Sequence, residues 1–229
     1  MPVAFVTGAA SGIGAAIASE LSARGWYVGS LDLRSAPECS ASQIVDMTDG
    51  AAVSAAAQAL TERLGPPDAV VSAAGHYEML PISEISSESW SRMLQVHLGG
   101  LVNLTHAVLP GMLDRESGAI VAITSELAIG GGGDDSHYAA AKGAVIGLVR
   151  SLAAEVAARG VRVNAVAPGP TDTPLLAADS PWRAADYLAT LPAGRLTRPD
   201  EVALCVSALI EEGSFCVGEI LSPNSGAVI

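Results

Sequence analysis

Hydrophobic and polar positions follow two alternating patterns along the chain. Short, nearly continuous apolar runs, such as 119–124 (AIVAIT), are typical of strands buried on both faces. Longer segments between these runs place apolar residues at helical spacing. The expected strands are 3–7, 27–32, 43–46, 68–72, 119–125, 162–167 and 219–222, and the expected helices lie near 12–24, 49–64, 84–109, 138–158 and 199–211. Strands that alternate with helices need crossover connections, so the pattern predicts an α/β fold, a doubly wound parallel sheet with helices on both faces.

The whole chain, residues 1–229, is expected to form a single domain. A length of 229 residues suits one α/β domain, and no linker, repeat or low-complexity tract interrupts the pattern. The segment at about 170–195, rich in proline and alanine, breaks the alternation. It is the best candidate for a flap over a substrate.

Composition excludes several kinds of protein. Half of the residues are hydrophobic, and the formal net charge of −12 would repel nucleic acid. The three cysteines, an odd number without metal-ligand spacing, predict reduced thiols and no metal site. The first residues lack a basic region, and no stretch of about 20 residues is uncharged and apolar enough to span a bilayer. We therefore expect a soluble cytoplasmic protein without nucleic-acid or membrane partners.

A glycine-rich loop follows the first expected strand. In residues 7–21 (TGAASGIGAAIASEL), Gly8, Gly12 and Gly14 stand between that strand and an amphipathic helix. Glycine lets the backbone turn sharply and approach a pyrophosphate, while the helix N-terminus supplies free N–H groups and a positive dipole. Glycine also marks ordinary turns, but the order strand, loop and helix favours a dinucleotide-binding site.

The second expected strand ends at Asp32, 18 residues after Gly14. A carboxylate at this position can accept both ribose hydroxyls of NAD and would repel the 2′-phosphate of NADP. Arg34 can in principle pair with that phosphate, and Asp32 can also be no more than a solvated residue at a strand end. The sequence favours NAD over NADP.

Residues 136–142 (SHYAAAK) place Tyr138 and Lys142 on one face of an expected helix. A nearby ammonium favours phenolate and would lower the pKa of Tyr138 from about 10, which would make the phenol a usable acid or base. Ser125, at the end of the preceding strand, can hydrogen-bond a substrate oxygen and hold it against Tyr138. A Tyr and a Lys at this spacing are common, so it is the combination with the glycine loop that indicates a catalytic site.

This combination resembles the short-chain dehydrogenase/reductase family. TGAASGIG matches the family's TGxxxGxG loop, YAAAK matches its YxxxK, and Ser125 stands 13 residues before Tyr138, as the family's catalytic serine does. Residues 162–174 (RVNAVAPGPTDTP) look like the family's stretch after the sixth strand, and Asp46 matches its adenine-contacting acid. The similarity extends over essentially the whole chain.

The resemblance implies a Rossmann-like fold with seven strands in the order 3-2-1-4-5-6-7 and NAD(P) at their carboxyl ends. It also implies hydride transfer between the nicotinamide and an alcohol or carbonyl group. Tyr138 would be the general acid and base, Ser125 would polarise the substrate oxygen, and Lys142 would tune Tyr138 and hold the ribose. The expected cofactor-binding residues are Gly8, Ser11, Gly12, Ile13, Gly14, Asp32, Asp46, Met47, Ala74, Gly75, Tyr138, Lys142, Pro168, Gly169, Thr171 and Thr173.

Three positions depart from the family pattern. Residues 72–75 read SAAG where the family has NNAG, and residues 224–226 read NSG where it has DGG. His97, in QVHLGG, stands where the family commonly has an Asn that holds a water leading to the catalytic lysine. An imidazole both donates and accepts hydrogen bonds, so His97 can hold this water or relay a proton; equally, it can be a neutral core histidine bonded to a backbone carbonyl. We count His97 among the catalytic candidates.

The expected substrate pocket is largely apolar with a few polar groups, as small-molecule sites tend to be. Its expected residues are His76, Glu126, His137, Leu175 and Trp182. Glu126 is unusual because it is charged and adjoins Ser125; it either binds a polar or cationic substrate group or points to solvent.

The leading interpretation is an NAD-dependent oxidoreductase acting on a secondary alcohol or ketone. The alternatives are an NADPH-dependent ketoreductase of 3-oxoacyl or polyketide type and a non-catalytic dinucleotide sensor. The helices at 90–109 and 138–158 are apolar on nearly every side, which predicts a homo-oligomer, a dimer or tetramer.

Overall fold

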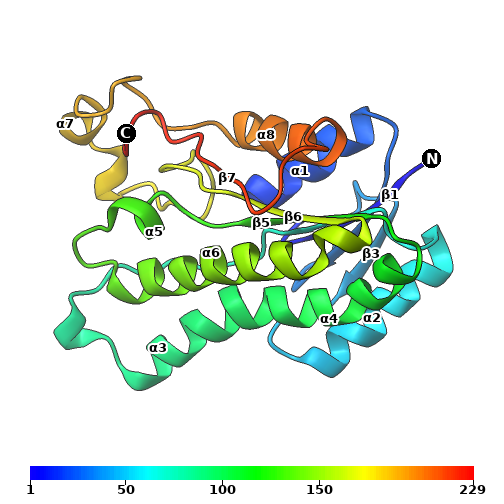
Figure 1. The fold of residues 1–229 in the computed structure, drawn as a ribbon. Coiled ribbons are helices and arrows are strands. Elements are labelled where there is room, and N and C mark those ends of the chain that lie inside the picture. Colours follow the sequence, from blue (N-terminus) through cyan, green and yellow to red (C-terminus); the bar gives the residue numbers. More distant parts are fainter.

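The computed structural model describes all residues, 1–229, and contains one seven-stranded parallel sheet (Figure 1). The strand order is β3-β2-β1-β4-β5-β6-β7, which confirms the expected order. The strands are β1 (Val3–Thr7), β2 (Tyr27–Asp32), β3 (Ala41–Ile44), β4 (Ala69–Ser72), β5 (Gly118–Ile123), β6 (Val161–Val166) and β7 (Ile220–Leu221).

Helices cover both faces of the sheet. In Figure 1, α1 and α8 lie above it, while α2, α4 and α6 lie below it. The helices are α1 (Gly12–Ala23), α2 (Gly50–Leu64), α3 (Ser87–Leu94), α4 (Gly100–Asp114), α5 (Leu127–Gly130), α6 (Ser136–Val156), α7 (Ala185–Leu188) and α8 (Pro199–Glu211), with short 3-10 turns at Ile82–Glu84, Ala157–Arg159 and Pro181–Arg183. The doubly wound α/β fold expected from the hydrophobic pattern is therefore confirmed.

Strand β1 shows why both faces must be covered. All five of its residues are buried, and successive side chains point to opposite faces. Val3 and Phe5 belong to the hydrophobic cluster under α2, α4 and α6, whereas Ala4 and Val6 belong to the cluster under α1 and α8. A strand with apolar residues on both faces is stable only between two helical layers.

The continuous helical run Ser87–Asp114 is divided by a π-helical turn, Gln95–Gly99, which separates α3 from α4. The sequence pattern predicted one uninterrupted helix here and did not show the extra residue in this turn. Contrary to the sequence expectation, this run is long and apolar enough to cross a membrane by length and composition alone. Leu101, Leu104 and Val108 of α4 are buried in the core cluster, which accounts for much of this apolar character.

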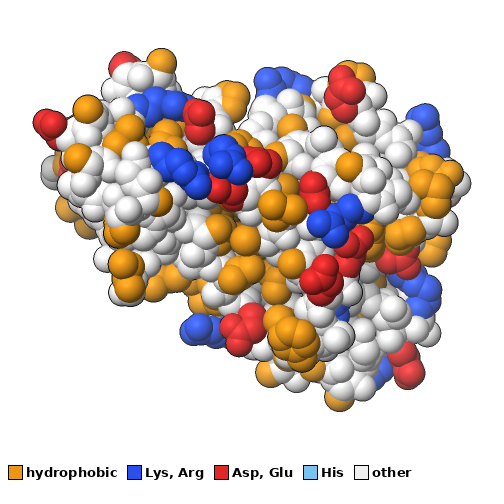
Figure 2. Space-filling model, turned by 90° about the horizontal axis from the view of Figure 1, so that it is seen from above, with side chains coloured by type: hydrophobic (Ala, Val, Ile, Leu, Met, Phe, Trp, Pro, Cys, Tyr) orange, Lys and Arg blue, Asp and Glu red, His pale blue; other side chains and the backbone are white.

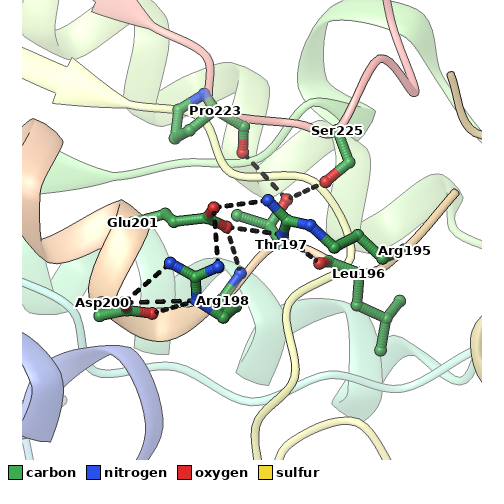
Figure 3. A network of polar contacts seen from close by, with 8 residues as sticks. All are labelled: Arg195, Leu196, Thr197, Arg198, Asp200, Glu201, Pro223 and Ser225. Carbon is green, nitrogen blue, oxygen red and sulfur yellow. Dashed lines mark hydrogen bonds and ion pairs between the residues drawn. The ribbon is translucent and has the colours of Figure 1, made fainter. Parts of the chain in front are cut away.

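The segment after the expected flap is fixed by a polar network (Figure 3). Arg195 donates to both carboxylate oxygens of Glu201 at 2.6 and 2.9 Å, and Glu201 also accepts the backbone N–H of Arg198 at 2.8 Å. The hydroxyls of Thr197 and Ser225 are hydrogen-bonded at 3.0 Å. These contacts tie the end of the flap to the N-terminus of α8 and to the last residues of the chain.

Charges of both signs are scattered over the face seen in Figure 2, where blue basic side chains lie beside red acidic ones. Arg24, for example, donates to Glu20 of its own helix and to Glu211 of α8. Such mixed charge gives this face no continuous basic stripe of the kind that binds a phosphate backbone.

Candidate active site

The glycine loop follows β1 at the carboxyl edge of the sheet, and its glycines are sterically required. Gly8 has a φ of +70°, and a Cβ there would lie 2.9 Å from the backbone of Ala74. A Cβ on Gly14 would lie 2.2 Å from the carbonyl oxygen of Gly8. The loop is therefore packed against its neighbours so closely that only glycine fits, and its outer side lines a cleft.

Asp32, at the end of β2, braces this loop. Its carboxylate accepts the N–H of Ala10 at 3.0 Å and the N–H of Arg34 at 2.9 Å. The guanidinium of Arg34 in turn donates to the hydroxyl of Ser11 at 2.9 Å. The Asp32 carboxylate and the Arg34 guanidinium thus lie side by side. A dinucleotide bound along the glycine loop would place its adenosine ribose next to both.

Asp46 and Met47 lie on the far wall of the same end of the cleft. Asp46 accepts both the N–H and the hydroxyl of Thr48 at 2.9 Å, and these bonds lower the pKa of its carboxyl. Met47 is fixed through its carbonyl oxygen, which accepts the amide of Asn103 at 2.8 Å.

The loop after β4 is held without the amide side chains that the family pattern supplies. Thr7 accepts the N–H groups of both Ala73 and Ala74, each at 2.9 Å. This hydroxyl, buried beneath the loop, takes the bracing role at the SAAG departure. Gly75 is required by His97, because a Cβ on Gly75 would lie 2.5 Å from Cε1 of that ring.

Tyr138 and Lys142 lie on the face of α6 that lines the cleft. The ammonium of Lys142 donates to the carbonyl oxygen of Ile123 at 2.8 Å and stands 5.7 Å from the centre of the Tyr138 ring. Thr124 fixes the helix from the other side by donating to the carbonyl oxygen of Lys142 at 2.8 Å.

The pKa of Tyr138 differs from the sequence expectation. Burial raises it above its ordinary value, and the neighbouring carboxylate of Glu126 raises it further, while a hydrogen bond with Ser125 lowers it. Lys142 does not lower it, because the ammonium is held at Ile123. Burial lowers the pKa of Lys142 itself to about 7, since its only hydrogen-bond partner is a neutral carbonyl.

Ser125 and Glu126 form a buried pair just beyond β5. The Ser125 hydroxyl donates to a carboxylate oxygen of Glu126 at 2.7 Å and accepts the N–H of Leu127 at 3.2 Å. Each residue is only 5% exposed, and both line the cleft. Glu126 therefore does not point to bulk solvent. Burial raises the pKa of its carboxyl to about 7.

His97 is presented by the π-helical turn and is 4% exposed. Its Nε2 lies 2.8 Å from the carbonyl oxygen of His76, which can only accept, so Nε2 carries the proton and Nδ1 is an acceptor. Nδ1 is buried and makes no hydrogen bond in the structure. Burial holds the pKa of His97 well below its usual range, so the ring is neutral. His97 bonds a backbone carbonyl, as one of the two expectations has it, and its ring meets that of Tyr138 edge-on. The relay role stays a prediction.

The flap is connected to the cleft by a chain of three polar side chains. The indole N–H of Trp182 donates to the hydroxyl of Tyr77 at 2.9 Å, and that hydroxyl donates to Asp135 at 2.6 Å. Tyr77 also meets Tyr138 edge-on, with ring centres 5.0 Å apart. Sequence reasoning missed Asp135, because a carboxylate before a helix resembles an ordinary cap until its burial is known.

All these elements enclose one cleft of about 590 Å³. It is lined by every expected site residue except one: Gly8, Ser11, Gly12, Ile13, Gly14, Asp32, Asp46, Met47, Ala74, Gly75, His76, His97, Ser125, Glu126, Tyr138, Lys142, Pro168, Gly169, Thr171, Thr173, Leu175 and Trp182.

The exception is His137, which was expected to bind substrate. Its side chain is completely buried, and it stacks on Trp90 with ring centres 6.2 Å apart. On a helix, neighbouring residues point in directions about 100° apart, so when Tyr138 faces the cleft His137 must face the packing between α6 and α3. Sequence adjacency to Tyr138 was misleading here.

The fold, the glycine loop and the cleft have counterparts in known proteins. The family model described as short chain dehydrogenase matches residues 2–184. The chain belongs to this short-chain dehydrogenase/reductase family, whose members are oxidoreductases that use a nicotinamide dinucleotide.

Individual relatives extend over nearly the whole chain. It is 40% identical to cis-4-hydroxycyclohexanecarboxylate dehydrogenase of Sinomonas cyclohexanicum, over 98% of this chain and 95% of that protein. It is 36% identical to the 3-oxoacyl-acyl-carrier-protein reductase FabG of Vibrio cholerae, over 98% and 96%. The ligand-free aldohexose dehydrogenase of Thermoplasma acidophilum is a similar solved structure, with a TM-score of 0.91, 31% identity, and coverage of 98% of this chain and 93% of that one.

Proposed function

We propose that the protein transfers a hydride between NAD(H) and a secondary alcohol or its ketone. The observation that carries this proposal is the meeting of Ser125, Tyr138 and Lys142 on the wall of the same cleft that the glycine loop lines. A cleft that joins a dinucleotide cradle to a buried acid–base group is suited to moving a hydride and a proton together.

The expected dinucleotide fits the residues present. Ser11, at the N-cap of α1, makes no side-chain capping bond, so the first N–H groups of this helix lack that partner at the side of the cleft, where a pyrophosphate can accept them. When bound, the nicotinamide supplies the site that accepts or gives the hydride. Thr171 and Thr173, on the segment after β6, line the cleft and are placed to hold that end of the cofactor.

The protein's own residues handle the proton and the substrate oxygen. In the direction of alcohol oxidation, Ser125 orients the oxygen, and Tyr138 takes the proton as the hydride leaves the carbon. Lys142, whose ammonium stands 5.7 Å from the centre of the Tyr138 ring, holds the ribose. His97, whose ring contacts that of Tyr138 and whose Nδ1 has no partner, holds a water molecule through which this proton passes on toward solvent.

NAD is favoured by Asp32, whose carboxylate would repel a 2′-phosphate. One observation favours the second candidate, an NADPH-dependent 3-oxoacyl-type reductase. The guanidinium of Arg34 lies at the mouth of the cleft beside Ser11, where it can pair with such a phosphate. The chain is also 36% identical to the 3-oxoacyl-acyl-carrier-protein reductase FabG of Vibrio cholerae.

The family commonly forms oligomers, and we propose a dimer or tetramer for this chain as well. The run Ser87–Asp114 supports this proposal. In its most apolar stretch of 18 residues, only 39% of the residues are buried within one chain. Light scattering of the purified protein measures the assembly directly.

The decisive experiment is a panel of secondary alcohols and ketones assayed with each dinucleotide by nicotinamide absorbance. We expect turnover with NAD(H) that exceeds turnover with NADP(H). Tyr138→Phe should lower kcat by about 10²- to 10⁴-fold while the protein still binds the dinucleotide. Binding without turnover by the wild type would instead favour a non-catalytic sensor, and full turnover by Tyr138→Phe would contradict the acid–base role.

A further inference from the structure

Glu126 places a buried carboxyl group that has no cation partner beside the position that a reacting oxygen would occupy. The residue lines the cleft and is only 5% exposed to solvent. Among the side chains, only Ser125 donates a hydrogen bond to it. It takes part in none of the ion pairs of the structure. A buried carboxylate without a cation is costly, so its presence in a substrate cleft calls for a partner.

The surrounding groups do not supply this partner. The charge of Asp135 raises the pKa of Glu126, and the charge of Glu126 raises the pKa of Tyr138 and of Tyr187; none of these three side chains is a cation. Lys142, which does line the cleft, spends its hydrogen bond on Ile123. No cation of the chain therefore compensates Glu126, and its carboxyl group lines the cleft, where a donor on the substrate can reach it.

We propose that Glu126 selects substrates that carry a hydroxyl or ammonium group on the carbon next to the reacting carbon, and disfavours substrates that carry an anion there. This inference rests on the proposed function, since it takes Ser125 to be the residue that holds the reacting oxygen. It adds a substrate class, vicinal diols and amino alcohols or the corresponding ketones.

The distances support this assignment. Glu126 lies 2.7 Å from Ser125 Oγ, and a substrate oxygen bound to that hydroxyl lies one further hydrogen bond away, about 2.8 Å. Hydroxyls on neighbouring carbons are themselves about one hydrogen bond apart. A second substrate hydroxyl can therefore bond Glu126 while the first stays on Ser125 and Tyr138.

The chemistry of the pair explains the selectivity. Above its pKa of about 7 the Glu126 carboxyl is ionised, so the test belongs at a pH above about 8. A hydrogen bond to an ionised carboxylate is stronger than one between neutral groups, and it is strongest where water is excluded. A carboxylate on the substrate would meet a like charge in the same buried space and would lack a counter-ion. A substrate with no group there would leave Glu126 unpaired.

The test compares three cyclic alcohols that differ only beside the reacting carbon. These are cyclohexanol, cis-1,2-cyclohexanediol and cis-2-hydroxycyclohexanecarboxylate, assayed with NAD. We expect kcat/KM for the diol to exceed that for cyclohexanol about ten- to a hundredfold, with the carboxylate the poorest substrate. Glu126→Ala should bring the diol-to-cyclohexanol ratio to about one. Glu126→Gln should keep part of the diol preference, since its amide oxygen accepts, but accept the carboxylate better than the wild type does.

The ratio separates selection from a merely structural role. Ser125 acts on the oxygen that all three alcohols share, so any disturbance of Ser125 cancels in the ratio. Glu84→Ala, which removes an exposed carboxylate outside the cleft, is the matched control and should leave the ratio unchanged. An unaltered ratio in Glu126→Ala would overturn the proposal.

Binding gives a second readout that does not depend on turnover. Trp182 lines the cleft, so its fluorescence should report binding of each alcohol to the protein with NADH present, a pairing in which no hydride can be transferred. If no alcohol is oxidised but the diol still binds more tightly in a Glu126-dependent manner, the proposed reaction fails and the selectivity stands. If binding shows no dependence on Glu126, the selectivity fails whatever the reaction.

Discussion

The ring of His97 meets the ring of Tyr138 edge-on, with the ring centres 5.4 Å apart and the planes at 88°. This contact joins a histidine of the π-helical turn to the tyrosine that we propose as the acid–base group. The neutral ring offers a free acceptor, Nδ1, and the Nδ1 atom of the stacked His76 ring is also buried without a partner.

The first prediction concerns this acceptor. His97→Ala should lower kcat by about tenfold and change its pH profile, because the water that links Tyr138 to solvent would lose the Nδ1 atom to which it donates. His97→Asn should keep most of the activity, since an amide oxygen can hold the same donor. Steady-state kinetics across pH measure both effects. An alanine variant with the wild-type kcat and pH profile would leave His97 as a packing residue only.

Closure of the flap should depend on the indole donor of Trp182. Trp182→Phe removes the hydrogen bond to Tyr77 but keeps an aromatic ring to pack on Tyr187, which is 4.8 Å away between ring centres. One net hydrogen bond corresponds to a rise in substrate KM of about two- to tenfold. Trp26→Phe is the matched control, because its indole donates to Glu211 at 2.8 Å on the surface of α1 and α8. Equal KM changes in both variants would argue against a flap latch.

The glycine loop provides a steric prediction. Gly14→Ala places a methyl group 2.2 Å from the carbonyl oxygen of Gly8, so the loop must shift. We expect dinucleotide binding, measured by titration calorimetry, to weaken by at least about tenfold, because backbone N–H groups must approach the pyrophosphate closely. Gly133→Ala has no atom within 4 Å of the new Cβ and should bind as the wild type does. A wild-type Kd in a folded Gly14→Ala protein would place the dinucleotide elsewhere.

The free energy of unfolding should depend on pH because of Lys142. Its pKa is about 7 in the folded protein, against 10.5 when unfolded. Between these values the unfolded chain binds more protons, so this residue makes the free energy of unfolding rise with pH from about 7 to 10.5 and adds no slope below that range. In Lys142→Met this contribution should vanish, which urea titrations of both proteins between pH 7 and 10 can detect. Parallel pH dependences would show that the lysine is not desolvated.

The sequence determined the architecture because each element carries its own signal. Buried strands, amphipathic helices and the glycine loop are local patterns, and all seven strands lie within two residues of their expected ends. Only β3 is shifted as a whole by two residues, toward the N-terminus, at an edge where Ile44 is exposed and burial constrains the register less. The YxxxK spacing similarly placed Tyr138 and Lys142 on one helical face, and both line the cleft.

Only the tertiary structure decided the environments of these residues. The direction of the Tyr138 pKa depends on burial and on Glu126, and the sequence showed neither, since a pKa reflects desolvation and charges in space. His137 adjoins Tyr138 in sequence but lies against Trp90, while Asp135 and Trp182, 47 positions apart by number, meet through Tyr77. Local patterns fix which residues form strands and helices, whereas packing between distant segments fixes what each side chain faces and, with it, the chemistry it can perform.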